Sequence, residues 1–184
     1  HTAYRRQRQM CIRDSLSDVA KKVMRGKTMN AGQICLAPDY LMLPKGKSEE
    51  FAKASNEAIS EMFADLKYNE DYTSVINERH YERINELVSD AKEKGAEVIQ
   101  INPADEDFEQ QELHKIPPTL VLNPTDEMKI MQEEIFGPVL PVKEYEDFDE
   151  TVNYVNSKDR PLGLYLFSKD KNCLLYTSDA ADDM

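Results

Sequence analysis

The sequence predicts an α/β domain in which helices flank a layered and largely parallel sheet. Segments with apolar residues three and four positions apart alternate with short apolar runs, and these two patterns indicate helices and buried strands. No internal repeat and no low-complexity tract interrupts the alternation. With 40% hydrophobic residues in a chain of 184, the sequence can also build a substantial core. Together these observations are typical of a layered α/β domain.

The first helix is expected to start at residues 17–18, because the Ser17 side chain can accept hydrogen bonds from the free amide groups of a first turn. Its apolar stripe consists of Val19, Ala20, Val23 and Met24. The apolar run 40–43, which Pro44 stops, predicts a buried strand. Ser48 then opens a second helix. The apolar face of that helix consists of Phe51, Ala54, Ala58, Ile59, Met62, Phe63 and Leu66.

Asn77 is the expected cap of a third helix, and Gly95 follows the helix as the residue type that suits a left-handed end. The apolar face of this helix consists of Tyr81, Ile84, Leu87, Val88 and Ala91. Residues 98–101 are a candidate strand, and the polar, acidic residues 102–115 are expected to form a surface loop.

Two short apolar runs, 119–122 and 138–142, predict further strands. The run Asp147–Glu150 has the spacing of a capping box and predicts the start of another helix, with Val152 and Val155 inside it. Residues 164–167 are expected to form the last strand.

The composition excludes several classes of function. The chain is 32% charged with a formal net charge of −12, which argues against nucleic-acid backbones and anionic membranes as partners. No apolar run reaches the length of a membrane span, and no secretory signal opens the sequence. The cysteines show no CxxC spacing and the histidines are scattered, so we expect no metal site and a reducing, cytoplasmic location. These residues are Cys11, Cys35, Cys173, His1, His80 and His114.

The two ends differ from the middle of the chain. Residues 1–15 carry four arginines and one aspartate, a net charge of +3, whereas residues 173–184 carry three aspartates, a net charge of −3. Neither end has the periodicity of a helix or a strand. Both ends resemble translated adaptor-like sequence, so we expect artefactual or disordered ends and one partial domain over residues 16–172. The alternative is a basic arm and an acidic tail that bind partners.

Cys35 is the main candidate for a catalytic residue. It lies in the segment Asn30–Tyr40, just beyond the first helix, with glycine and small residues on its N-terminal side. A thiolate is the attacking species in covalent catalysis at a carbonyl carbon. The alternative is a small hydrophobic residue buried in the core, which is a common role of free cysteine.

A second distinctive segment runs from Glu133 to Val139. Glu134 and Phe136 are its candidate ligand-binding residues, and Gly137 allows a turn where a Cβ would obstruct the backbone. The alternative is a solvated charge pair, Glu133 and Glu134, next to a phenylalanine of the core.

Taken together, the two segments resemble the aldehyde dehydrogenase superfamily in their order and separation, and the resemblance covers nearly everything between the two ends. The amino-acid sequence of residues 32–40, 71–74 and 77–81 looks closest to that of the coniferyl aldehyde dehydrogenases of the class 3-like branch.

The resemblance implies roles for individual residues. Cys35 matches the family nucleophile, which forms a thiohemiacetal with the aldehyde and then a thioester after hydride transfer to NAD⁺ or NADP⁺. Its backbone N–H matches one donor of the oxyanion hole. Glu134 matches the glutamate that binds the nicotinamide ribose, and Phe136 matches the aromatic residue beside the nicotinamide.

The resemblance also implies parts that this sequence lacks. The family's general base lies in a Glu-Leu-Gly-Gly-Lys segment, which does not occur in these 184 residues, and the nucleotide-binding half is not present either. We therefore expect a fragment that is inactive by itself and prone to associate, from a parent enzyme that forms a homo-oligomer, either a dimer or a tetramer. The aldehyde and the choice between NAD⁺ and NADP⁺ stay open.

Two other functions compete with this interpretation. The chain could be a non-catalytic interaction module with a buried structural Cys35. It could also be a thiol hydrolase, which would require His80 or His114 within hydrogen-bond reach of Cys35.

Overall fold

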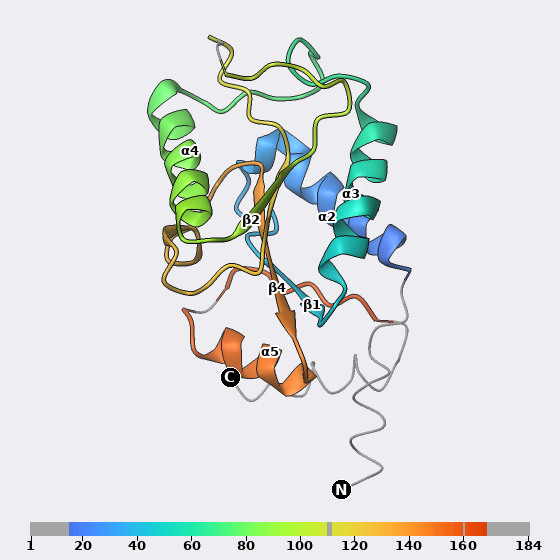
Figure 1. Ribbon diagram of the computed structural model, residues 1–184, viewed down its shortest axis with the longest axis vertical. Coiled ribbons are helices and arrows are strands. Elements are labelled where there is room, and N and C mark those ends of the chain that lie inside the picture. Colours follow the sequence, from blue (N-terminus) through green and yellow to red (C-terminus); the bar gives the residue numbers. More distant parts are fainter. Residues whose placement is uncertain (1–14, 110–111, 160, 169–184) are drawn as a thin grey trace, which may run out of the picture.

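A four-stranded sheet is the middle layer of the part of the chain that the computed structural model describes, residues 15–109, 112–159 and 161–168 (Figure 1). Its strands are β1 (Leu41–Pro44), β2 (Glu97–Gln100), β3 (Thr119–Leu122) and β4 (Val139–Tyr145). The spatial order is β1-β4-β3-β2, with β4 parallel to both β1 and β3 and with β2 antiparallel to β3. The prediction of a largely parallel sheet is confirmed.

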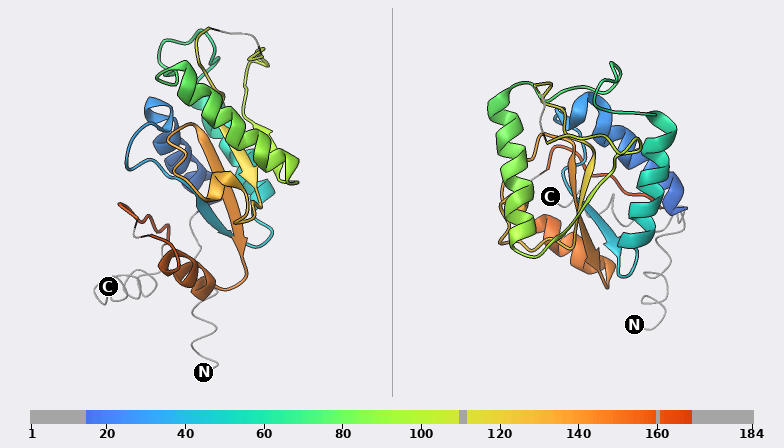
Figure 2. Two further views of the ribbon diagram at one scale, coloured as in Figure 1. Left: turned by 90° about the vertical axis from the view of Figure 1, so that its left-hand side faces the viewer. Right: turned by 45° about the horizontal axis from the view of Figure 1, so that its top comes forward.

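Helices cover both faces of this sheet. Helices α2 (Leu16–Thr28) and α3 (Ser48–Met62) pack on one face, and α4 (Glu78–Glu93) packs on the other (Figures 1 and 2). Successive side chains of β3 point to opposite faces. Leu120 and Leu122 therefore join the core beneath α2 and α3, whereas Val121 joins the core beneath α4. The sheet thus separates two hydrophobic cores and contributes side chains to both.

Helix α5 (Phe148–Asn156) follows β4 and contributes no fully buried residue. It is held through Tyr154, whose ring meets the Tyr40 ring edge-on at 5.7 Å and whose hydroxyl donates to Asp126 Oδ1 at 2.7 Å. Two short 3₁₀ turns, η1 (Met29–Gly32) and η2 (Lys129–Met131), complete the regular structure of the described residues. No helix among the described residues has the length and apolar character needed to cross a membrane.

Three predicted helix ends are confirmed. Asn77 Oδ1 accepts the His80 N–H at 3.0 Å at the start of α4, and Gly95 has a φ of +90° after its end. Asp147 caps α5 by accepting the Asp149 N–H at 3.2 Å. The return bond of the capping box differs slightly, because Glu150 accepts from Glu146 rather than from the cap residue.

The predicted start of one helix and one predicted strand are wrong. Helix α2 starts at Leu16 rather than at Ser17, since packing of the Leu16 side chain into the core draws it into the first turn. Ser15 at the cap position makes no capping hydrogen bond through its side chain. Residues 164–167 do not form a strand, because no strand of the described chain pairs with them. Leu164 and Tyr165 remain largely exposed, and only Phe167 packs against the core.

The two-sided burial of β4 gives a first prediction. Leu140 is fully buried in this strand, whereas Leu162 is 79% exposed. Leu140→Ala should lower the free energy of unfolding by about 2–5 kcal/mol, because it removes buried methyl groups and leaves a cavity. Leu162→Ala is the matched control and should change that free energy by less than about 0.5 kcal/mol. Urea unfolding measures both, and equal losses would contradict the packing described.

Candidate active site

The segment that leads to Cys35 has an unusual backbone. Asn30, Ala31 and Gly32 have φ values of 50°, 51° and 72°, so three successive residues are left-handed. For a residue with a Cβ this conformation costs about 1–2 kcal/mol. Side-chain amides hold the turn: Asn30 Nδ2 donates to Gln33 O at 3.2 Å, and Gln33 Nε2 donates to Asn30 O at 3.0 Å.

Cys35 lies at the exposed tip of the next turn. The Ala37 N–H donates to Ile34 O at 2.9 Å, which places Cys35 and Leu36 at the two central positions of the turn. The Cys35 thiol is free and the residue is exposed, so the alternative of a buried structural cysteine is wrong. Within the described chain, the Cys35 backbone N–H donates to no protein acceptor.

The Glu134 loop comes between η2 and β4. Ile135 is buried in the core beneath α4, whereas the residues on both sides of it, Glu134 and Phe136, are exposed. Phe136 is 38% exposed and has a φ of 49°, a conformation that is rare for an aromatic residue. The alternative in which Phe136 belongs to the core is therefore wrong, because Ile135 is the residue that anchors this loop.

Sheet topology brings the two segments together. The Cys35 turn leads into β1 and the Glu134 loop leads into β4, and these strands are parallel neighbours. A Cβ on Gly32 would lie 2.7 Å from the carbonyl carbon of Gly137, so the two backbones are in direct contact. The Ile135 N–H also donates to Asp39 Oδ1 at 3.1 Å. Two segments about a hundred residues apart in the sequence thus form one site.

Lys27 lies beneath this junction, and the sequence analysis missed it. Its side chain is 1% exposed and its Nζ donates to Pro38 O at 2.8 Å. Burial lowers the pKa of Lys27 to about 8, and the carboxylates of Asp39 and Glu134 oppose that shift. The sequence did contain a signal, since Lys27 occupies the next position of the apolar stripe of α2, three and four residues after Met24 and Val23.

The histidines do not complete a Cys–His pair in the described residues. His114 Nε2 lies 2.6 Å from Glu78 Oε2, and His80 is exposed on the first turn of α4. Neither ring hydrogen bonds to Cys35 there. The described part of the chain also has no group of three or more His, Cys, Asp or Glu side chains that could hold a metal ion.

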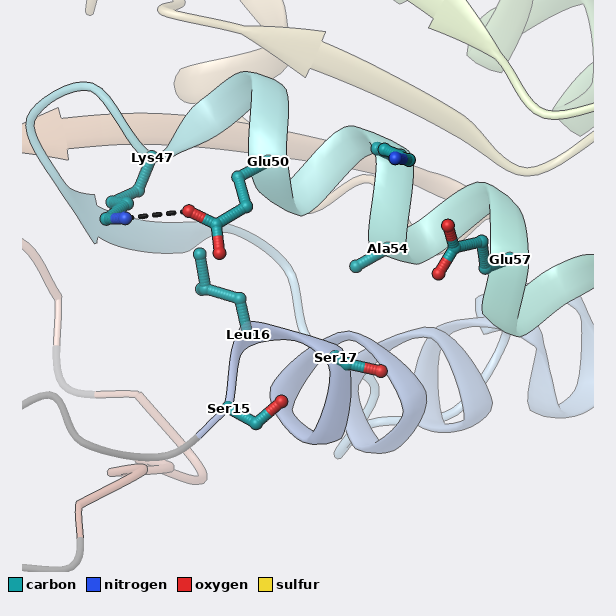
Figure 3. A pocket seen from close by; sticks show the side chains of 8 residues that line it. Ser15, Leu16, Ser17, Lys47, Glu50, Ala54 and Glu57 are labelled. Atoms are coloured by element: carbon teal, nitrogen blue, oxygen red, sulfur yellow. Dashed lines mark hydrogen bonds and ion pairs between the residues drawn. The ribbon is translucent and has the colours of Figure 1, made fainter.

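A separate groove lies between the start of α2 and α3 (Figure 3). Charged side chains of both signs line it, and Lys47 forms an ion pair with Glu50 at 2.7 Å. Cys35, Glu134 and Phe136 do not line this groove. The 13 residues of α2, a length of about 20 Å, separate it from the Cys35 turn.

Comparison with known proteins places this chain in a family. The profile of the aldehyde dehydrogenase family matches residues 13–182. The chain belongs to this family. Over 156 residues it is 58% identical to a probable coniferyl aldehyde dehydrogenase of Caulobacter vibrioides, with 85% of this chain and 32% of that protein covered. It is 48% identical over 155 residues to a coniferyl aldehyde dehydrogenase of a Pseudomonas species, with 84% and 32% covered.

A solved structure agrees with the described fold. The substrate-bound AldH of Staphylococcus aureus superimposes with a TM-score of 0.80 at 28% sequence identity, covering 92% of this chain and 35% of that one. The chain therefore spans about a third of the length of the aldehyde dehydrogenases that it matches.

The contact between the two backbones predicts a specific loss of stability. Gly32→Ala should lower the free energy of unfolding by about 3 kcal/mol or more, because the new methyl group overlaps with the Gly137 carbonyl. Gly46 is the matched control: its φ is +77°, but a Cβ there meets nothing within 4 Å. Gly46→Ala should cost only about 1–2 kcal/mol, the cost of the left-handed conformation alone. Similar urea midpoints for the two variants would show that the contact at Gly32 is not tight.

Burial of Lys27 predicts a dependence of stability on pH. The pKa is about 8 in the folded chain and 10.5 for the unperturbed group, so between these values the unfolded state binds more protons. The stability of the natural chain should therefore rise relative to that of Lys27→Met, by about 2 kcal/mol between pH 7.5 and pH 10. Urea unfolding of both chains at the two pH values measures the difference, and parallel pH profiles would refute the burial of a titrating amine.

Proposed function

We propose that the protein to which this chain belongs oxidises an aldehyde to a carboxylic acid with NAD⁺ or NADP⁺, through Cys35. The observation that carries this proposal is the contact between the exposed thiol turn and the Glu134 loop, in a chain of the aldehyde dehydrogenase family. A candidate nucleophile and a candidate cofactor-binding loop thereby lie at one site.

In the proposed reaction the Cys35 thiolate attacks the aldehyde carbon, and the carbonyl oxygen becomes the oxyanion of a thiohemiacetal. The Cys35 backbone N–H has no protein acceptor in the described residues, so it is free to donate to that oxyanion. The carbon then loses a hydride and becomes a thioester. Hydrolysis releases the carboxylic acid and restores the thiol.

Glu134 and Phe136 are the proposed cofactor contacts. The cofactor supplies the acceptor for the hydride. The exposed Glu134 carboxylate can accept hydrogen bonds from two adjacent ribose hydroxyls, and the exposed Phe136 ring can pack beside a nicotinamide. Both side chains face solvent rather than the core, which fits a ligand contact for each.

The identities of 58% and 48% to coniferyl aldehyde dehydrogenases support an aromatic aldehyde such as coniferyl aldehyde as the substrate. We further propose a cytoplasmic enzyme that forms a homo-oligomer and has no nucleic-acid or membrane partner, in keeping with the acidic net charge of −12.

Protection of the thiol tests the proposal. Iodoacetamide should modify Cys35 in the folded chain, and a millimolar aromatic aldehyde should slow that modification, because thiohemiacetal formation consumes the free thiol. The corresponding aromatic alcohol is the control and should give no protection. Peptide mapping by mass spectrometry distinguishes Cys35 from the other two cysteines. Equal effects of aldehyde and alcohol would argue against attack on the carbonyl.

The same preparation tests turnover. Because the 184 residues contain no Glu-Leu-Gly-Gly-Lys segment, we expect no aldehyde-dependent formation of NADH or NADPH above a Cys35→Ala control. A rate above that control would show that the chain supplies its own general base.

A further inference from the structure

A short segment next to the site, Ser74–Ile76, is fixed firmly to the rest of the domain. The Tyr72 hydroxyl donates to Ile116 O at 2.6 Å, and the Val75 N–H donates to His114 O at 2.9 Å. The side chains of Tyr72 and Val75 are both buried. These bonds and buried side chains anchor the segment to the domain, and it serves as a support for the site.

Gln33 attaches the Cys35 turn to this support. Its Nε2 donates to Ser74 O at 3.0 Å, and its Oε1 accepts the Ile76 N–H at 2.9 Å. One side-chain amide thus pairs with the backbone on both sides of Val75, in the way that a neighbouring strand would. Gln33 is two residues before Cys35, so its position limits where the thiol can lie.

The same support continues into the helix that holds the other half of the site. Asn77 caps α4 directly after Ile76. Less than two turns later, Arg83 donates to Glu134 O at 3.2 Å and to Ile135 O. The planar guanidinium group can bond two successive carbonyls at once, and it does so where the loop departs from ordinary backbone geometry at Phe136.

We propose that Gln33 and Arg83 are positioning residues, and that residues 74–83, the bridge segment, set the position of Cys35 relative to Glu134. The inference rests on the roles proposed above for those two residues. Each side chain holds one loop of the site through backbone atoms, and the bridge segment joins the two attachment points in ten residues. The bridge segment thus sets the position of the two loops relative to each other, and the direct contacts between the loops complete the site.

Two amide hydrogens report on the two loops without being bonded to Gln33 or Arg83. The Ala37 N–H closes the Cys35 turn on Ile34 O, and the Ile135 N–H is bonded to Asp39 Oδ1. Their exchange with solvent can be followed by NMR in the 184-residue chain. Exchange of the Val121 N–H in the central sheet serves as the reference for global unfolding.

Gln33→Met removes the two bonds to the support and also the bond to Asn30 O, and it should accelerate exchange of the Ala37 N–H about tenfold. Arg83→Met removes two bonds to the Glu134 loop and should accelerate exchange of the Ile135 N–H by a similar factor. The decisive variant is Asn77→Ala, which removes the cap of α4 between the two attachment points and touches neither loop. It should accelerate amide exchange at both reporters, Ala37 and Ile135, about threefold.

Asp147→Ala is the matched control, because it removes the side-chain cap of α5 in the same way. It should leave the exchange rates of both reporters unchanged after they are corrected for global unfolding with the rate of the Val121 N–H. The proposal is overturned if Asn77→Ala has no more effect than Asp147→Ala, or if either single variant fails to accelerate its own reporter. These rates do not depend on whether Cys35 attacks an aldehyde, so thiol protection can fail while the exchange result holds, and the reverse is also possible.

Discussion

The contact between the backbones of Gly32 and Gly137 is the constraint on which the rest of the site depends. Gly32 is left-handed and has no room for a Cβ, because the Gly137 carbonyl occupies that space. Gly137 is enclosed from the other side as well, since a Cβ there would lie 2.5 Å from Ile84 Cδ1 of α4. Helix α4, the Glu134 loop and the Cys35 turn are thus stacked against one another, with no side chain between the backbones of Gly32 and Gly137.

This contact follows from the order of the strands. Because β1 and β4 are parallel neighbours, the segments that enter them meet at the same edge of the sheet. The geometry has an energetic cost in the left-handed residues before Cys35 and at Phe136, and such strain is found where the surrounding structure fixes a functional segment. Lys27 adds a second cost, since an ammonium group is removed from water beneath the loops with only Pro38 O as its hydrogen-bond acceptor in the described chain.

Local sequence patterns predicted most elements. The strand 119–122 and the start of α3 at Ser48 agree with the structure. Both follow from local patterns: an apolar run between turn residues indicates the strand, and a polar residue before an apolar stripe indicates the start of the helix. The failures have tertiary causes. Leu16 enters α2 because it packs into the core, and residues 164–167 lack a partner strand. The sequence also contains Pro141, a residue expected in an edge strand, yet β4 is central because its side chains are buried on both faces.

The sequence by itself supplied the candidate residues of the site, a cysteine after a helix and an acidic and aromatic loop before a strand, and a family resemblance that the family profile confirms. It did not determine that these two loops touch, because parallel strand order depends on long-range burial rather than on local propensity. It also did not reveal Gln33, Arg83 or Lys27 as supports, since each acts by bonding to backbone carbonyl or N–H groups, which every residue possesses. Only the tertiary structure decided which carbonyls and N–H groups lay within reach.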